Sequence, residues 1–99
     1  MISPHEVVVP VQLAKGKSKL VGTGNKLAVA GDYREALDCY VGAMAENPED
    51  HGAVFNAGVM HEALGQFKQA ESYYDRARKM EPKEQYIFAR RRVRTEGGE

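Results

Sequence analysis

Small and apolar residues recur along this chain at the spacing of a helix face. From about residue 18 they lie three or four positions apart, as Leu20, Gly24 and Leu27 do, and this period is typical of a helix with one buried side. A glycine or a proline ends each run, and both residue types stop helices. The pattern predicts five helices between about residues 18 and 94, separated at Gly31, Pro48, Gly65 and Pro82.

The second predicted helix shows how its start and its buried face are inferred. Asp32 stands at the N-cap position, and Glu35 three residues later completes a capping-box pattern. Asp50 is the expected cap of the third helix. The residues expected to form the buried stripe of the second helix are Leu37, Tyr40, Val41 and Met44.

The chain matches itself when it is shifted by 34 residues. The coinciding pairs are Gly24 and Gly58, Gly31 and Gly65, Tyr33 and Phe67, Ala36 and Ala70, Tyr40 and Tyr74, Ala43 and Ala77, and Pro48 and Pro82. Repetition at such a period indicates units that stack on one another. We therefore expect an all-α fold of two helix hairpins and a closing helix, with small residues at helix crossings and aromatic rings between hairpins.

These positions resemble the tetratricopeptide repeat family, whose 34-residue helix pairs carry a glycine, an alanine four residues before an aromatic ring, and a closing proline. The resemblance covers about residues 17–84. It implies an antiparallel helix-hairpin stack. The chain is expected to divide into an extended or flexible N-terminal arm over 1–16, a first repeat over 17–50, a second over 51–84 and a C-terminal capping helix over 85–96.

Smaller or more polar residues replace three of the family's large side chains in each repeat. They are Leu20, Thr23 and Leu27 in the first repeat, and Val54, Ala57 and His61 in the second. This predicts a modest core. Because repeat arrays usually need about three units to be stable alone, self-association or a partner is expected to help.

The resemblance implies a non-catalytic module that binds a protein or peptide segment in the groove formed by the first helix of each pair. The residues that it places in this partner-binding groove are Val21, Asn25, Phe55, Asn56, Val59, Tyr86 and Arg90. Phe55 and Tyr86 would serve as apolar anchors. General binding of an extended or helical segment is the favoured interpretation.

Capture of a peptide's C-terminal carboxylate is a narrower possibility. Family members that do this line the groove with two asparagines and three bases. Asn25, Asn56 and Arg90 match that set, whereas Val21 and Tyr86 stand at the other two basic positions. An amide and a guanidinium can both donate to a carboxylate.

Charge is strongly segregated although the formal net charge is zero. Residues 32–62 hold seven acids and one base, and residues 76–94 hold eight bases and two acids. Two alternatives follow: binding of nucleic acid or an anionic surface through Arg90, Arg91, Arg92 and Arg94, or self-assembly in which basic ends meet the acidic middle of a neighbour. Zero net charge makes nucleic acid the less favoured partner.

No residue pattern indicates catalysis, a metal or a cofactor. His61 and Glu62 begin a zinc-protease motif, but Gly65 stands where the second histidine is required. The glycines and lysines near residues 15–24 lack the order of a phosphate-binding loop. Cys39 is the only cysteine, which excludes an intramolecular disulfide.

The first residues of the chain carry a different pattern. Val7, Val8, Val9 and Val11 favour an extended arm, and Pro10 restricts it to an edge or unpaired segment. They lack the features of an export signal, and no apolar run approaches the roughly 20 residues of a membrane span. With a single cysteine, these features favour a cytoplasmic location.

Overall fold

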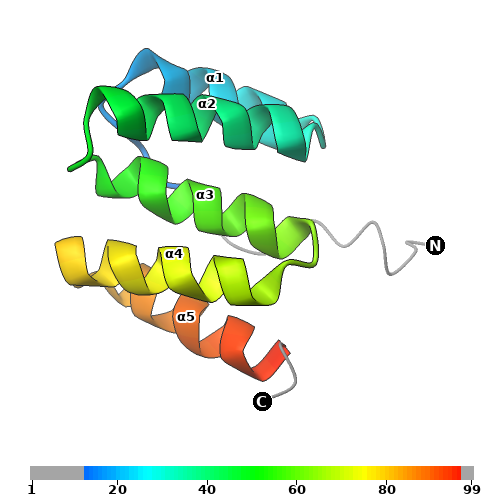
Figure 1. The fold of residues 1–99 in the computed structure, drawn as a ribbon, viewed down its shortest axis with the longest axis vertical. Helices are drawn as coiled ribbons and strands as arrows, with labels where there is room; N and C mark the ends of the chain where they lie inside the picture. The colour runs from blue at the N-terminus through cyan, green and yellow to red at the C-terminus, as the bar shows by residue number, and fades with distance from the viewer. Residues whose placement is uncertain (1–12, 97–99) are drawn as a thin grey trace.

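Five helices make up the computed structural model, which describes residues 13–96. They are α1 (Lys19–Val29), α2 (Tyr33–Glu46), α3 (His51–Ala63), α4 (Phe67–Met80) and α5 (Glu84–Glu96). Each helix packs on the next, α1 also touches α3, and the hairpins stack in one row (Figure 1). The expected all-α helix stack is confirmed. The predicted extended stretch at Val7–Val11 lies outside the described residues.

No helix within residues 13–96 has the length and hydropathy that crossing a membrane requires.

The ends of the helices are set by local sequence. Gly31 and Gly65 follow α1 and α3 with φ of +89° and +79°. In this left-handed conformation the next residue bonds back to the helix: Asp32 N–H donates to Leu27 O at 2.9 Å. The prediction that both glycines end helices is confirmed.

Caps and prolines set the other helix ends. The Asp50 carboxylate accepts from the Ala53 N–H at 3.3 Å and so caps α3 as predicted. Asp32 occupies the N-cap position of α2, but its side chain makes no capping bond. The predicted capping box is therefore wrong, and the Asp32 N–H, from which Glu35 would accept, donates to Leu27 O instead. Asn47, which precedes a proline, is extended and ends α2.

Two tyrosines in the same register form the centres of the two hairpins. Tyr40 and Tyr74 are 0% exposed. A Cβ built on Gly24 would lie 2.6 Å from Tyr40 Cε1, and one built on Gly58 would lie 2.7 Å from Tyr74 Cε1. Each ring therefore requires the absence of a side chain on the facing helix, which explains why both glycines recur at the 34-residue period.

The middle of the stack is α3, which is buried on every side from Gly52 to Met60. Helices α2 and α4 bury only one face each. Val41 was expected in the buried stripe of α2, and this expectation is wrong because its side chain is 47% exposed. It lies on the outer face of α2, one position beyond the buried Tyr40.

Helix α5 carries a large side chain where the hairpins have glycine. Arg92 lies 34 positions after Gly58, and its guanidinium donates to Glu62 at 2.7 and 3.2 Å. The Glu62 side chain is 8% exposed and Arg92 is 29% exposed. This charge-assisted pair fastens α5 to the end of α3.

Candidate functional site: the asparagine face

Asn56 on α3 is a fully buried polar side chain that binds the segment before α1. Its Nδ2 donates to Ala14 O at 2.8 Å, and its Oδ1 accepts from Ala14 N–H at 2.8 Å. One carboxamide therefore satisfies both main-chain groups of a single residue, as a neighbouring β-strand does. The segment passes behind α3 in the view of Figure 1. We call the surface of α1 and α3 beneath residues 13–17 the asparagine face.

Asn25 on α1 extends this contact into the core. Its Nδ2 donates to Ala14 O at 3.3 Å, and its Oδ1 accepts from Asn56 Nδ2 at 3.1 Å and from the Tyr40 hydroxyl at 2.5 Å. Burial raises the pKa of the Tyr40 hydroxyl, which therefore stays protonated and donates at neutral pH. A continuous hydrogen-bond network thus joins the first hairpin to the bound backbone.

Asp50 and two glycines hold the rest of the segment. Asp50 Oδ2 accepts from Lys17 N–H at 2.9 Å while its other oxygen caps α3. A Cβ on Gly52 would lie 2.1 Å from Lys15 O, and one on Gly16 would lie 2.4 Å from Val21 Cγ2. The side chains of Lys15 and Lys17 are exposed. The segment is therefore recognised mainly through its backbone.

The apolar residues predicted for the groove are buried in the structure. Val21 is 1% exposed, and Phe55, Val59 and Tyr86 are 0% exposed. The Phe55 ring stacks on Tyr86 with centroids 4.6 Å apart. These side chains belong to the hydrophobic core, so they do not present exposed anchors.

Tyr86 also has a polar role at the junction of α5 and α3. Its hydroxyl lies 2.7 Å from His51 Nδ1. Burial, together with the carboxylates of Asp50 and Glu81, raises the pKa of Tyr86 to about 12. The hydroxyl is therefore neutral at physiological pH and fixes the orientation of the His51 ring.

Arg90 makes its ionic contact with α4. Its Nε lies 3.1 Å from Asp75 Oδ1, whereas Asn25 and Asn56 bond to each other. Arg78 and Lys79 also bind Asp75, and the Arg78 hydrogen bond is the main reason why the pKa of that carboxyl is lowered. The structure thus brings together two of the three residues matched to carboxylate capture and engages the third elsewhere.

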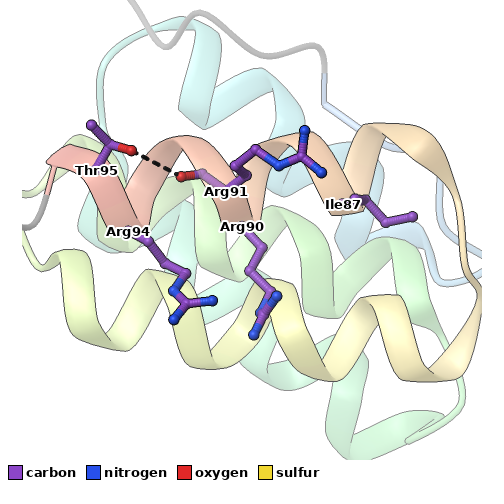
Figure 2. Close-up of a pocket in the computed structure, with 5 residues that line it drawn as sticks. All are labelled: Ile87, Arg90, Arg91, Arg94 and Thr95. Atoms are coloured by element: carbon purple, nitrogen blue, oxygen red, sulfur yellow. Dashed lines mark hydrogen bonds between the residues drawn. The ribbon is translucent and has the colours of Figure 1, made fainter. Parts of the chain in front are cut away.

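An open hollow of about 400 Å³ lies along α5, with Arg90 and Arg94 directed toward α4 (Figure 2). Arg94 Nε is 3.1 Å from Glu71 Oε2. The hollow is lined by Ile87, Arg90, Arg91, Arg94 and Thr95. Two of its three arginines therefore already contact carboxylates, which reduces the positive potential available to an anionic ligand.

Sequence reasoning missed both sides of the contact made by residues 13–17. Within the segment it missed Ala14 and Lys17, and beneath the segment it missed Gly52 and the second role of Asp50. One signal was present. Gly52 lies in the first turn of a predicted helix, where glycine is unfavourable, and such a glycine often marks a close backbone approach. Within residues 13–96 no three His, Cys, Asp or Glu side chains gather where they could hold a metal ion.

Comparison with known proteins gives a consistent family match. The model of a family described as tetratricopeptide repeat matches residues 22–85. Human tetratricopeptide repeat protein 6 is 33% identical over 63 residues, which is 64% of this chain and 12% of that protein. The chain therefore corresponds to only a small part of this relative.

Proposed function

Because this chain belongs to the tetratricopeptide repeat family, whose repeats generally mediate protein–protein interaction or assembly, we propose that it binds an extended polypeptide segment on the asparagine face. The observation that carries the proposal is the pair of hydrogen bonds between Asn56 and the backbone of Ala14, one donated by each residue. Proteins of this family are generally non-catalytic, and the proposed role requires no cofactor.

The chemistry of Asn56 favours a peptide backbone over other ligands. The side chain is 0% exposed, so its donor and acceptor both need partners. An extended residue offers an N–H and a C=O on the same side, which match the two ends of a carboxamide. Leaving either end unsatisfied costs about 1–3 kcal/mol. The face is therefore built for a main chain in an extended conformation.

The same contact argues for an internal segment over a C-terminal carboxylate. Asn56 Oδ1 accepts a hydrogen bond from Ala14 N–H, and an ionised carboxylate has no hydrogen with which to donate one. Arg90, the cation that carboxylate capture would use, contacts Asp75. Nucleic-acid binding through α5 is also less favoured, because Arg90 and Arg94 both contact acidic side chains.

The test is selection of random 12-residue peptides displayed on phage against two forms of the 99-residue chain. One is the unmodified chain, and the other is Gly16→Val, in which a side chain would collide with Val21 and displace the chain's own segment. We expect the selected peptides to bind at least tenfold more weakly when Asn56→Ala is introduced into the chain against which they were selected. Asn47→Ala, in the turn after α2, is the matched control.

Circular dichroism of every variant establishes that the helices remain. Peptides that bind both asparagine variants equally would place the site elsewhere. Failure of both chains to select any peptide that depends on Asn56 would overturn the proposed function.

A further inference from the structure

We infer that residues 13–17 are a built-in occupant of the asparagine face and display the pattern that a partner segment must share: an apolar residue, a small residue, any residue, then glycine. In this chain the four are Leu13, Ala14, Lys15 and Gly16. The inference rests on the proposed function and specifies its ligand. The partner is a segment of another protein that competes with residues 13–17.

The glycine is the strictest element of this pattern. A Cβ on Gly16 would lie 2.4 Å from Val21 Cγ2 and 2.9 Å from Asp50 Oδ2. Val21 is 1% exposed and Asp50 is 3% exposed, so neither has free space into which to move. A larger residue at this position would lift the backbone and break the bond from Lys17 N–H to Asp50.

The other positions follow from what each side chain meets. Leu13 is half-buried against the core. The site of a Cβ on Gly52 lies 3.5 Å from Ala14 Cβ, so Ala14 lies close to the α3 backbone, which favours a small residue. The Lys15 side chain is exposed and sets no requirement, although its carbonyl packs directly on Gly52.

Attachment to α1 makes the built-in segment a strong competitor. Only Ser18 separates Lys17 from the first residue of α1. A segment tethered this closely has an effective concentration in the millimolar range or above. A free peptide of the same sequence should therefore bind poorly until the built-in segment is displaced.

The experiment separates the segment from the face that holds it. Gly16→Val should displace the segment and leave the face intact, and Lys15→Val is the matched control with the same new residue at an exposed position. Gly52→Ala should displace the segment and also block the face. Gly22→Ala is its control, because a Cβ on Gly22 meets nothing within 4 Å.

Two readouts follow displacement and binding. Amide hydrogen exchange at Ala14 and Lys17 should accelerate at least tenfold in Gly16→Val and Gly52→Ala, and remain unchanged in both controls. An acetylated, dye-labelled peptide with the sequence of residues 11–18 should bind Gly16→Val at least tenfold more tightly than the unmodified chain. It should not bind Gly52→Ala, and a peptide with valine at the glycine position should lose at least tenfold in affinity.

Three outcomes would overturn the inference. They are equal peptide affinity in the unmodified and Gly16→Val chains, indifference to valine in the peptide, and sedimentation of the unmodified chain as a dimer that exchanges this segment. The phage selection could still yield peptides that depend on Asn56 but lack the glycine, so the proposed function can survive this failure. If Gly16→Val loses helix content, Leu13→Asp provides a second way to displace the segment.

Discussion

The two hairpins place a buried tyrosine over a glycine in the same way, yet they use the two hydroxyl groups differently. Tyr40 donates to Asn25, which is part of the asparagine face. Tyr74 donates to Glu62 at 2.7 Å, and Glu62 also binds Arg92 of α5. The first hairpin thus connects its core to the proposed binding site, and the second connects its core to the closing helix.

This difference shows how a repeated unit can acquire separate roles. Both repeats need a glycine beneath the tyrosine, since an added Cβ would lie 2.6 Å from the ring of Tyr40 and 2.7 Å from that of Tyr74. The hydroxyl lies at the end of the ring, where its partner depends on one nearby side chain. The two repeats therefore share the glycine beneath the ring and differ in the partner of the hydroxyl.

The largest predicted effects test whether the two rings are equivalent in packing. Tyr40→Ala and Tyr74→Ala should each lower the free energy of unfolding by about 3–5 kcal/mol, because each removes a buried aromatic ring. Urea denaturation followed by circular dichroism measures both losses. Values that differ by more than about 2 kcal/mol would show that the hairpins are not equivalent.

Glu62 should matter more than an acid that pairs with α5 at the surface. Glu62→Ala should lower the free energy of unfolding by about 2–3 kcal/mol, the upper range for hydrogen bonds to a charged group. Glu71→Ala is the matched control. Its partner Arg94 is 54% exposed, so the expected loss is below about 1 kcal/mol. Similar losses in urea denaturation would contradict the closing role of Glu62.

Removing one hydroxyl at a time should separate the two networks. Tyr74→Phe should cost about 2 kcal/mol, because its acceptor is charged, and Tyr40→Phe about 1 kcal/mol. Hydrogen exchange gives the sharper distinction. We expect faster exchange of the Ala14 amide in Tyr40→Phe alone, since only that hydroxyl orients Asn25. Acceleration of this amide by Tyr74→Phe would show that the networks are coupled.

The smallest predicted effect is the gain in stability from replacing Gly22, one of the two glycines of α1. Gly22→Ala should raise the free energy of unfolding by about 0.5–1 kcal/mol, because alanine is the better helix former and the added methyl meets nothing. Gly24→Ala should lower it, because the methyl would collide with the Tyr40 ring. Thermal unfolding is suited to both measurements. A gain from Gly24→Ala would mean that the ring moves freely.

The helix stack could be predicted from sequence because its signals are local and carried by side chains. Gly31 and Gly65 stop helices through their own conformational freedom, and the tyrosine and glycine positions recur at one period. The capping box at Asp32 failed because the glycine turn before it binds the Asp32 N–H to Leu27 O. Val41 failed because helical spacing alone does not tell which side of a half-buried helix meets a neighbour.

The candidate site could be predicted only in part. Asn25 and Asn56 were identified through the family resemblance, and the structure brings them together. The docking of residues 13–17 could not be foreseen, because it depends on N–H and C=O groups that nearly every residue possesses. The contact of Arg90 with Asp75 was equally hidden, since three bases from two helices converge on that one carboxylate.

The bond between Ala14 and Asn56 spans 42 positions of the chain, which has a consequence for biosynthesis. A ribosome adds Ala14 long before Asn56, and α1 and α2 can pair in the interval because their contacts are close in sequence. The backbone of Ala14 must wait for α3 before both of its groups are bound. The earliest described residues of the chain therefore reach their final positions only after α3 has been made, later than the first hairpin that follows them in sequence.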